Sequence, residues 1–330
     1  MKAEKITHER LGETVWLARA SCGAEIALIP KPGFATSSGW FGLRYGSTDT
    51  KFRVGEQEEI LVPDGSAHFL EHKLFEGREE KVFDRFGEIG ADFNGGTGFR
   101  STTYHFTSAG RFVEGLEVLL DFVQHPLITE ERVEKEKGII EQEVRMYEDL
   151  PHFRGLFLLH RGLYHQHPVR IPPGGAVSEV RRTSAAHLQA CFDAFYRPEN
   201  MKLALAGDFD PEEVFAMVED RLDSSSGRPE VTRLYPEEAE TPCAAVMEEC
   251  FEVVRPHIWI GWRESAGLGL GPENLRRHVL ASLVLDLALG DASVHHQELY
   301  ETGIVDQSFH TGYSSDSDWG YAVAAGESDN

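Results

Sequence analysis

Cysteine is scarce in this sequence, and its four residues are not arranged in metal-binding pairs. They lie at positions 22, 191, 243 and 250 of a 330-residue chain, and no two of them form a C-x-x-C pair. Such usage suits a reducing compartment. Long apolar runs are absent too. A membrane-spanning helix needs about 18 consecutive apolar residues, and the sequence has no such run. The first ten residues carry charges where a signal peptide has its apolar core. We therefore predict a cytoplasmic protein without membrane association.

Basic residues are few compared with acidic ones. Lys and Arg number 32 and Asp and Glu number 55, which gives a formal net charge of −23. We expect no nucleic-acid partner, because a phosphate backbone requires a basic protein face. The same charge disfavours anionic membrane surfaces. It would attract a cationic partner or substrate, and the alternative is that it serves solubility alone.

The composition that remains is that of a globular protein. Hydrophobic residues make up 41% and charged residues 26%, which excludes a disordered chain. The length predicts two domains. Residues 223–242 are rich in Ser, Gly, Pro and Glu and poor in apolar residues, so we predict a linker there. The predicted lobes are residues 1–222 and 243–330.

Strand patterns open the chain and helical patterns follow, which indicates an α+β fold. Strands are predicted at residues 14–20, 24–30, 40–47, 91–95, 102–107, 202–207 and 252–262. Helices are predicted at residues 66–75, 81–89, 111–124, 130–148, 153–164, 184–195, 211–222 and 273–289.

The strongest functional signal is an H-x-x-E-H pattern, His68 to His72, inside the helix predicted at residues 66–75. On a helix the two histidines lie one turn apart, about 40° around the axis, so both imidazoles can reach one metal ion. Glu71 lies on the same side, where it can polarise a metal-bound water. The alternative is a chance match on a solvent-facing helix. Against it stands an apolar face that would bury the helix: Phe69, Leu70, Leu74 and Phe75.

A catalytic zinc ion needs a third protein ligand, and the helix predicted at residues 130–148 offers candidates. Val133, Glu136, Ile140, Glu143 and Tyr147 follow the spacing of an inward-facing stripe. Carboxylates on such a stripe need a partner or a metal. One of the two glutamates could bind the ion while the other supports a histidine. The alternative is a solvated acidic helix.

Two separated segments resemble the insulinase/pitrilysin-type zinc metallopeptidases, also called inverzincins. Residues 65–77 resemble the active-site helix of that family, and residues 136–143 its second glutamate helix. Residues 62–68, 119–124, 134–140 and 304–309 are similar to a bacterial, YmfH-like branch that is related to mitochondrial processing peptidase. The resemblance covers nearly the whole chain.

The resemblance implies a role for each matching residue. His68, His72 and Glu143 would bind one Zn²⁺ per chain, Glu71 would be the general base, and Glu136 would support the site from behind. It also implies two related lobes, each a mainly antiparallel sheet covered by helices. Family members continue beyond residue 330, so the second lobe is expected to be incomplete, with exposed apolar surface that favours a dimer.

Asn94 falls where the family places an asparagine on a substrate-binding edge strand, which holds an extended peptide by β-augmentation. The family usually has alanine next, whereas this chain has Gly95 and Gly96. We expect these glycines to loosen the strand.

The resulting prediction is a zinc-dependent endopeptidase that hydrolyses extended or unfolded peptides. One alternative is a zinc-bearing subunit that is inactive or structural until it pairs with a related, peptidase-like partner in a homodimer or heterodimer. Another is a metal-dependent hydrolase of a non-peptide substrate. Serine-nucleophile chemistry is not supported, because the sequence has no G-x-S-x-G elbow.

Overall fold

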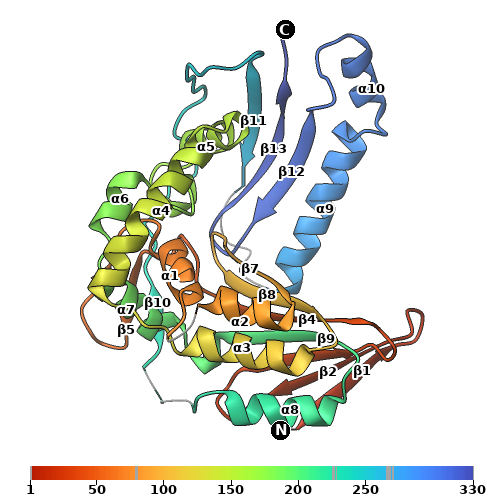
Figure 1. The fold of residues 1–330 in the computed structure, drawn as a ribbon. Coiled ribbons are helices and arrows are strands. Elements are labelled where there is room, and N and C mark those ends of the chain that lie inside the picture. The colour runs from red at the N-terminus through yellow and green to blue at the C-terminus, as the bar shows by residue number, and fades with distance from the viewer. Residues whose placement is uncertain are drawn as a thin grey trace. The chain divides into compact units, whose positions relative to one another are not determined.

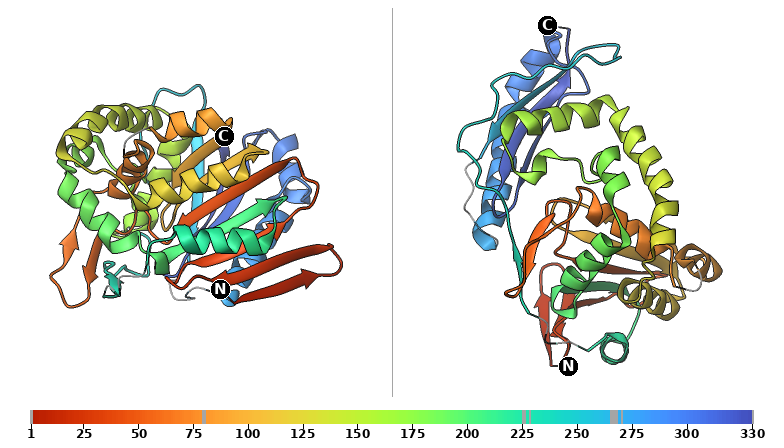
Figure 2. Two further views of the ribbon diagram at one scale, coloured as in Figure 1. Left: turned by 60° about the horizontal axis from the view of Figure 1, so that its bottom comes forward. Right: turned by 90° about the vertical axis from the view of Figure 1, so that its left-hand side faces the viewer.

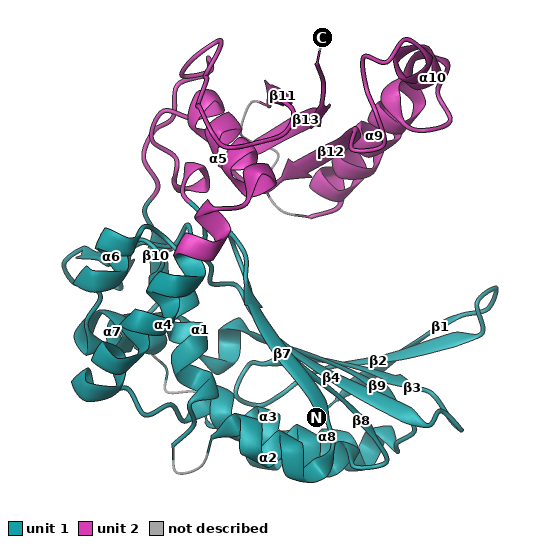
Figure 3. Ribbon diagram, turned by 45° about the horizontal axis from the view of Figure 1, so that its top comes forward, with its two compact units in different colours: residues 1–144, 172–234 teal, residues 145–171, 235–330 magenta. Residues whose placement is uncertain are grey.

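The computed structural model describes residues 2–78, 81–224, 227, 229–264, 269 and 271–329. The chain divides into two compact units (Figure 3). Unit 1 comprises Met1–Val144 and Pro172–Leu234, and unit 2 comprises Arg145–Ile171 and Tyr235–Asn330. The units differ from the predicted continuous lobes, because Arg145–Ile171 groups with the later part of the chain. Helix α5 (Pro151–Leu163), which lies in that segment, contacts strand β11 (His257–Arg263). Residues 225, 226 and 228 of the predicted linker lie outside the described residues.

Unit 1 is built on a seven-stranded sheet with the order β1-β2-β3-β9-β4-β8-β7. Its strands are β1 (Ala3–His8), β2 (Glu13–Arg19), β3 (Glu25–Pro30), β4 (Thr36–Leu43), β7 (Asp92–Thr97), β8 (Thr102–Ala109) and β9 (Met201–Gly207). All neighbours are antiparallel except β3 and β9. Strand β7 forms one border of the sheet, and the hairpin of β1 and β2, dark red in Figure 2, forms the other.

One face of this sheet is covered by helices. Buried and accessible residues alternate along β4 and β8, as expected when one face packs and the other stays open. Helices α2 (Val82–Ile89), α3 (Phe112–Gln124) and α8 (Pro211–Arg221) lie along the covered side (Figure 1). The predicted α+β class, with a mainly antiparallel sheet under helices, is confirmed for this unit.

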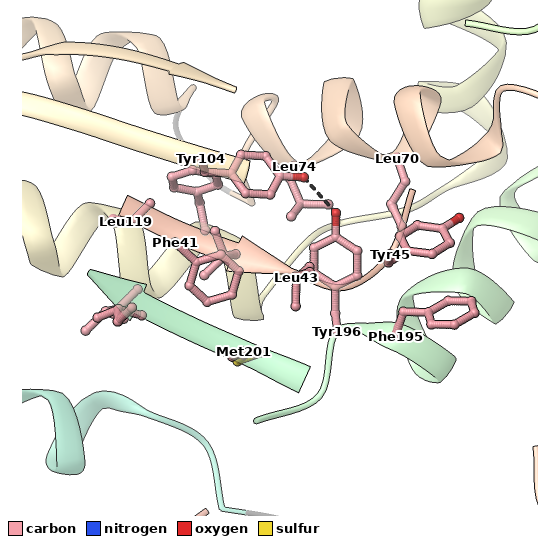
Figure 4. Close-up of a cluster of buried hydrophobic side chains, with 14 of the residues drawn as sticks. Phe41, Leu43, Tyr45, Leu70, Leu74, Tyr104, Leu119, Phe195, Tyr196 and Met201 are labelled. Atoms are coloured by element: carbon pink, nitrogen blue, oxygen red, sulfur yellow. Dashed lines mark hydrogen bonds between the residues drawn. The ribbon is translucent and has the colours of Figure 1, made fainter. Parts of the chain in front are cut away.

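The core of unit 1 lies between the sheet and its helices. Phe41, Tyr104, Leu119 and Tyr196 are buried there, and the hydroxyl groups of Tyr104 and Tyr196 are 2.7 Å apart in a hydrogen bond (Figure 4). Burial of these side chains, together with the rest of the core, stabilises the unit.

The remaining elements of unit 1 lie beside the sheet. They are helices α1 (Ser66–Phe75), α4 (Glu130–Glu148, whose last turn, from Arg145 on, belongs to unit 2), α6 (Val177–Arg182) and α7 (Ala185–Phe195), the 3₁₀ turn Pro198–Asn200, and a small sheet of β5 (Lys51–Val54), β6 (Ile60–Leu61) and β10 (Val231–Arg233). Helix α1 contacts α7 on one side and the strands β7 and β8 on another. The predicted bounds of α1 and α4 match the structure. The short β1, α6 and small sheet were not predicted.

Unit 2 contains an antiparallel three-stranded sheet with the order β11-β13-β12. Strand β12 is His310–Ser315 and β13 is Gly320–Glu327; α9 (Pro272–Leu289) contacts β12, and α10 (Val294–Glu301) contacts α9. The 3₁₀ turn Pro168–Arg170 completes the unit. No residue of α9 is buried, so the expected exposed apolar surface lies on this helix.

No single helix among the described residues is long and apolar enough to cross a membrane. Within this described part of the chain, one bent pair, Pro272–Leu289 and Val294–Glu301 with 44° between them, reaches the required length and composition when taken together.

Candidate metal centre

The local packing of α1 explains why both histidines face the same way. The helix starts after Gly65, whose φ of 87° is left-handed, and a Cβ at this position would lie 2.3 Å from the carbonyl oxygen of Gly174. Glycine therefore permits the close approach of the loop at residue 174. The predicted apolar face buries Phe69, Leu70 and Leu74 completely or nearly so. With that face fixed, the opposite side of the helix presents His68 and His72.

Three potential ligands converge between α1 and α4. One ligand atom from each of His68, His72 and Glu143 lies within 4.8 Å of the others. The Nε2 atom of His68 is 3.5 Å from Glu143 Oε1, and the Nε2 atom of His72 is 3.1 Å from Glu143 Oε2. Two imidazoles and one carboxylate form a ligand set that catalytic zinc sites use. No other cluster of three such side chains is found within the described residues.

The charges at this site are strongly coupled. Burial lowers the pKa of His72, but hydrogen bonds from its ring to Glu136 and Glu143 outweigh this and raise that pKa to about 9. The hydrogen bonds from His68 and His72 hold the pKa of Glu143 well below its ordinary value. Without a metal, the carboxylates therefore keep His72 protonated at neutral pH. A divalent cation would replace that proton.

Glu71 lies beside the ligands and is almost fully buried, with 7% of its surface exposed. Its Oε2 accepts a hydrogen bond of 2.6 Å from the hydroxyl of Thr97 on β7. Burial raises the pKa of Glu71, while Thr97, His68 and His72 oppose the rise. A buried carboxylate with a raised pKa is suited to accept and return a proton.

Glu136 lies behind the ligands, in contact with His72. Its Oε1 is 3.2 Å from His72 Nδ1, the ring nitrogen on the far side from Glu143. On the other side, Glu136 Oε2 is 3.9 Å from the ammonium of Lys73, which has no exposed side-chain surface. Lys73 also donates to Glu76 and, over 2.9 Å, to the carbonyl of Arg132. A carboxylate in this position orients a ligating imidazole.

Asn94 lies on β7, with its side chain exposed. Its Oδ1 accepts the N–H of Gly95 at 2.8 Å. The pairing of β7 with β8 runs without a break through both glycines, with Gly95 opposite Tyr104 and Gly96 opposite Thr103. The expected loosening of the strand is therefore not seen in its register.

The predicted stripe on α4 is correct over most of its length. Val133 and Ile140 are buried, and Glu136 and Glu143 face the α1 histidines. Tyr147, however, is 39% exposed, and its ring packs 5.1 Å from that of Phe153. The stripe ends early because the chain passes into unit 2 after Val144.

Comparison with known proteins identifies the family. The "uncharacterized zinc protease YmfH" of Bacillus subtilis (strain 168) is 36% identical to this chain over 325 residues, which cover 98% of this chain and 76% of that protein. The chain belongs to the insulinase family, peptidase family M16. The family model described as "Insulinase (Peptidase family M16)" matches residues 51–173, and that described as "Peptidase M16 inactive domain" matches residues 182–329.

Other proteins resemble the chain over different lengths. An uncharacterized zinc protease of Rickettsia felis is 29% identical over 189 residues, and the match spans 56% of this chain and 46% of that protein. A crystal structure of an M16-like peptidase from Alicyclobacillus acidocaldarius has a TM-score of 0.91 at 37% identity and covers 99% of this chain and 75% of that chain. The Pseudomonas fluorescens M16 inactive domain, with a TM-score of 0.78 at 17% identity, covers 95% of this chain and 74% of that chain and shows the fold alone.

Two residues of the site were not found from the sequence. Lys73 carried a signal, because a lysine within the apolar run of an otherwise buried helix needs a carboxylate partner. Thr97 carried none, because its contact with Glu71 joins residues that are 26 positions apart.

Proposed function

We propose that this chain is a zinc-dependent endopeptidase acting on extended or unfolded peptides. The observation that carries the proposal is the convergence of His68, His72 and Glu143, with the buried Glu71 carboxylate beside them. Membership of the insulinase family, together with relatives that are named zinc proteases, supports zinc as the ion.

The positions of the side chains support the proposed chemistry. When bound, zinc activates water and polarises a carbonyl group. His68, His72 and Glu143 would hold the ion, and Glu136 would orient the His72 ring through Nδ1. Glu71 would take a proton from the attacking water and deliver it to the leaving amine.

The open edge of the sheet supports the proposed substrate class. Strand β7 has β8 on one side and no strand on the other within the described residues, so its outer edge can pair with an extended peptide. We propose that Asn94, whose side chain is exposed on β7, contacts that peptide.

Replacing Glu71 tests the proposal. Glu71→Gln should retain about one zinc per chain, measured by metal analysis, and lose hydrolysis of fluorescein-labelled casein by roughly a thousand-fold or more. His295→Asn, at an exposed position on α10 in unit 2, is a control for loss of a histidine and should keep both zinc and hydrolysis. An active Glu71→Gln enzyme would contradict the assignment of the base.

A second candidate function is a zinc-bearing subunit that requires a related partner subunit. Two observations favour it: residues 182–329 match a model described as an inactive domain, and α9 exposes its apolar side chains. Hydrolysis of casein that rises more steeply than in proportion to chain concentration, in step with dimer formation by light scattering, would support a homodimer. Zinc binding without any hydrolysis would support a heterologous partner.

A further inference from the structure

The edge strand β7 contacts the candidate general base directly, through two residues on the same face. Residues alternate along a strand, so Phe93, Gly95 and Thr97 face α1 while Asp92, Asn94 and Gly96 face the other way. The hydroxyl of Thr97 donates to Glu71 Oε2 at 2.6 Å. A Cβ at Gly95 would lie 3.1 Å from Glu71 Oε1. The two oxygens of the carboxylate are therefore each bounded by one residue of β7.

The space at Gly95 is limited by an aromatic ring as well. The same Cβ would lie 2.7 Å from Cε2 and 2.9 Å from Cζ of Phe75, distances that require a shift. The Phe75 ring has little room to move, because it packs against the rings of Phe93, Tyr104 and Phe122 at centroid distances of 5.8, 5.5 and 5.5 Å. A side chain at position 95 would therefore displace β7, or would shift Phe75 and the Glu71 carboxylate beside it.

Gly96 provides the contrast. A Cβ at Gly96 would meet no heavy atom within 4 Å, because Gly96 faces away from α1. The two adjacent glycines thus differ: a Cβ at the first would crowd both the Phe75 ring and the Glu71 carboxylate, and a Cβ at the second would crowd neither. Flexibility of the strand does not explain this difference, because both glycines keep their register with β8.

We propose that Thr97 and Gly95 are positioning residues that couple strand β7 to the Glu71 carboxylate. A peptide paired with the outer edge of β7 is then held by the strand that also holds the base, which sets the distance between its scissile bond and Glu71. This inference rests on the proposed peptidase function. The hydrogen bond fixes one carboxylate oxygen, and the absence of a side chain at position 95 lets the other approach the strand.

The test compares isosteric and conservative variants in zinc-loaded protein, with labelled casein as substrate. Thr97→Val removes the hydroxyl at nearly constant volume and should lower kcat roughly ten-fold or more, because the lost hydrogen bond is to a charged group. KM and zinc affinity should stay within about two-fold, and Thr97→Ser should restore most of kcat. Thr107→Val, an exposed threonine on β8, is the matched control and should leave kcat unchanged.

Structure determination supplies a readout that does not depend on activity. Crystal structures should show the Glu71 carboxylate displaced in Thr97→Val and Gly95→Ala, and undisplaced in Thr107→Val and Gly96→Ala. If wild-type protein binds zinc but does not cleave casein, the proposed function fails, and these structures still decide whether β7 positions Glu71. Wild-type kcat in Thr97→Val, equal defects in Thr97→Val and Thr97→Ser, or a parallel loss of zinc affinity would overturn the inference.

Discussion

Helices α1 in unit 1 and α9 in unit 2 both carry apolar side chains, but they differ in how far these side chains are buried. Helix α1 has ten residues, and seven of them are buried, including Glu71 and Lys73. Helix α9 has eighteen residues, none of them buried, and Leu275 and Leu287 are 66% and 80% exposed. Ionisable groups inside α1 are retained because partners surround them. The comparison teaches that the candidate metal centre lies where packing is complete, and that the exposed apolar side chains of α9 lie where packing is open.

The largest expected effect is on zinc affinity, which should fall after substitutions at the candidate metal centre of unit 1 and not after a substitution in unit 2. Glu143→Ala removes a ligand and should weaken zinc binding by more than the roughly ten- to hundred-fold expected for Glu136→Gln, which removes only the partner of His72. His152→Ala, in unit 2, should leave the affinity unchanged. Isothermal titration with zinc measures all three. Full zinc occupancy in Glu143→Ala would remove Glu143 from the ligand set.

A matched pair of leucine truncations tests the difference in packing. Leu74 on α1 is completely buried, and Leu283 on α9 is 50% exposed. Leu74→Ala should cost about 2–5 kcal/mol of unfolding free energy. Leu283→Ala should cost under about 0.5 kcal/mol in dilute protein. Urea denaturation followed by circular dichroism measures both changes. A large cost for Leu283→Ala that grows with protein concentration would show that α9 is covered in solution by another copy of the chain.

The pH dependence of unit 1 should have two opposite parts. The folded-state pKa of His72 is raised from 6.5 to about 9, so its contribution to the stability of metal-free protein is fully present below pH 6.5 and is lost as pH rises through about 9. Zinc must displace that proton, so zinc affinity should rise about ten-fold per pH unit over the same range. Competition with a chelator at several pH values measures the slope. A flat profile would mean that His72 is already neutral.

The smallest expected effect concerns the net charge of −23. If this charge steers substrates, a Lys/Arg-rich peptide should be cleaved a few-fold faster than a neutral peptide of equal length at about 0.02 M salt, with the preference shrinking at about 0.3 M. Initial rates of both peptides at both salt concentrations are the measurement. Equal rates throughout would leave the charge with a role in solubility alone.

Local patterns in the sequence determined the parts of the site that lie within one helix. The spacing of His68 and His72 puts them on one side of α1 because an α-helix repeats every 3.6 residues, and the apolar face of the same helix determines which side that is. The seven-residue spacing of Glu136 and Glu143 placed both glutamates on one face of α4 for the same reason. The bounds of both helices followed from their start and stop signals.

Only the tertiary structure decided how these helices meet. Residue spacing left open which glutamate faces Nε2 of His72, and the packing of α4 against α1 places Glu143 there and Glu136 at Nδ1. The tertiary structure also brings Thr97 and Gly95 of β7 next to Glu71. It groups Arg145–Ile171 with the later part of the chain in unit 2. These relations join residues that are far apart in the chain. Helical and strand periodicity carries no information about them, because it records only which face of an element is buried and not what covers that face.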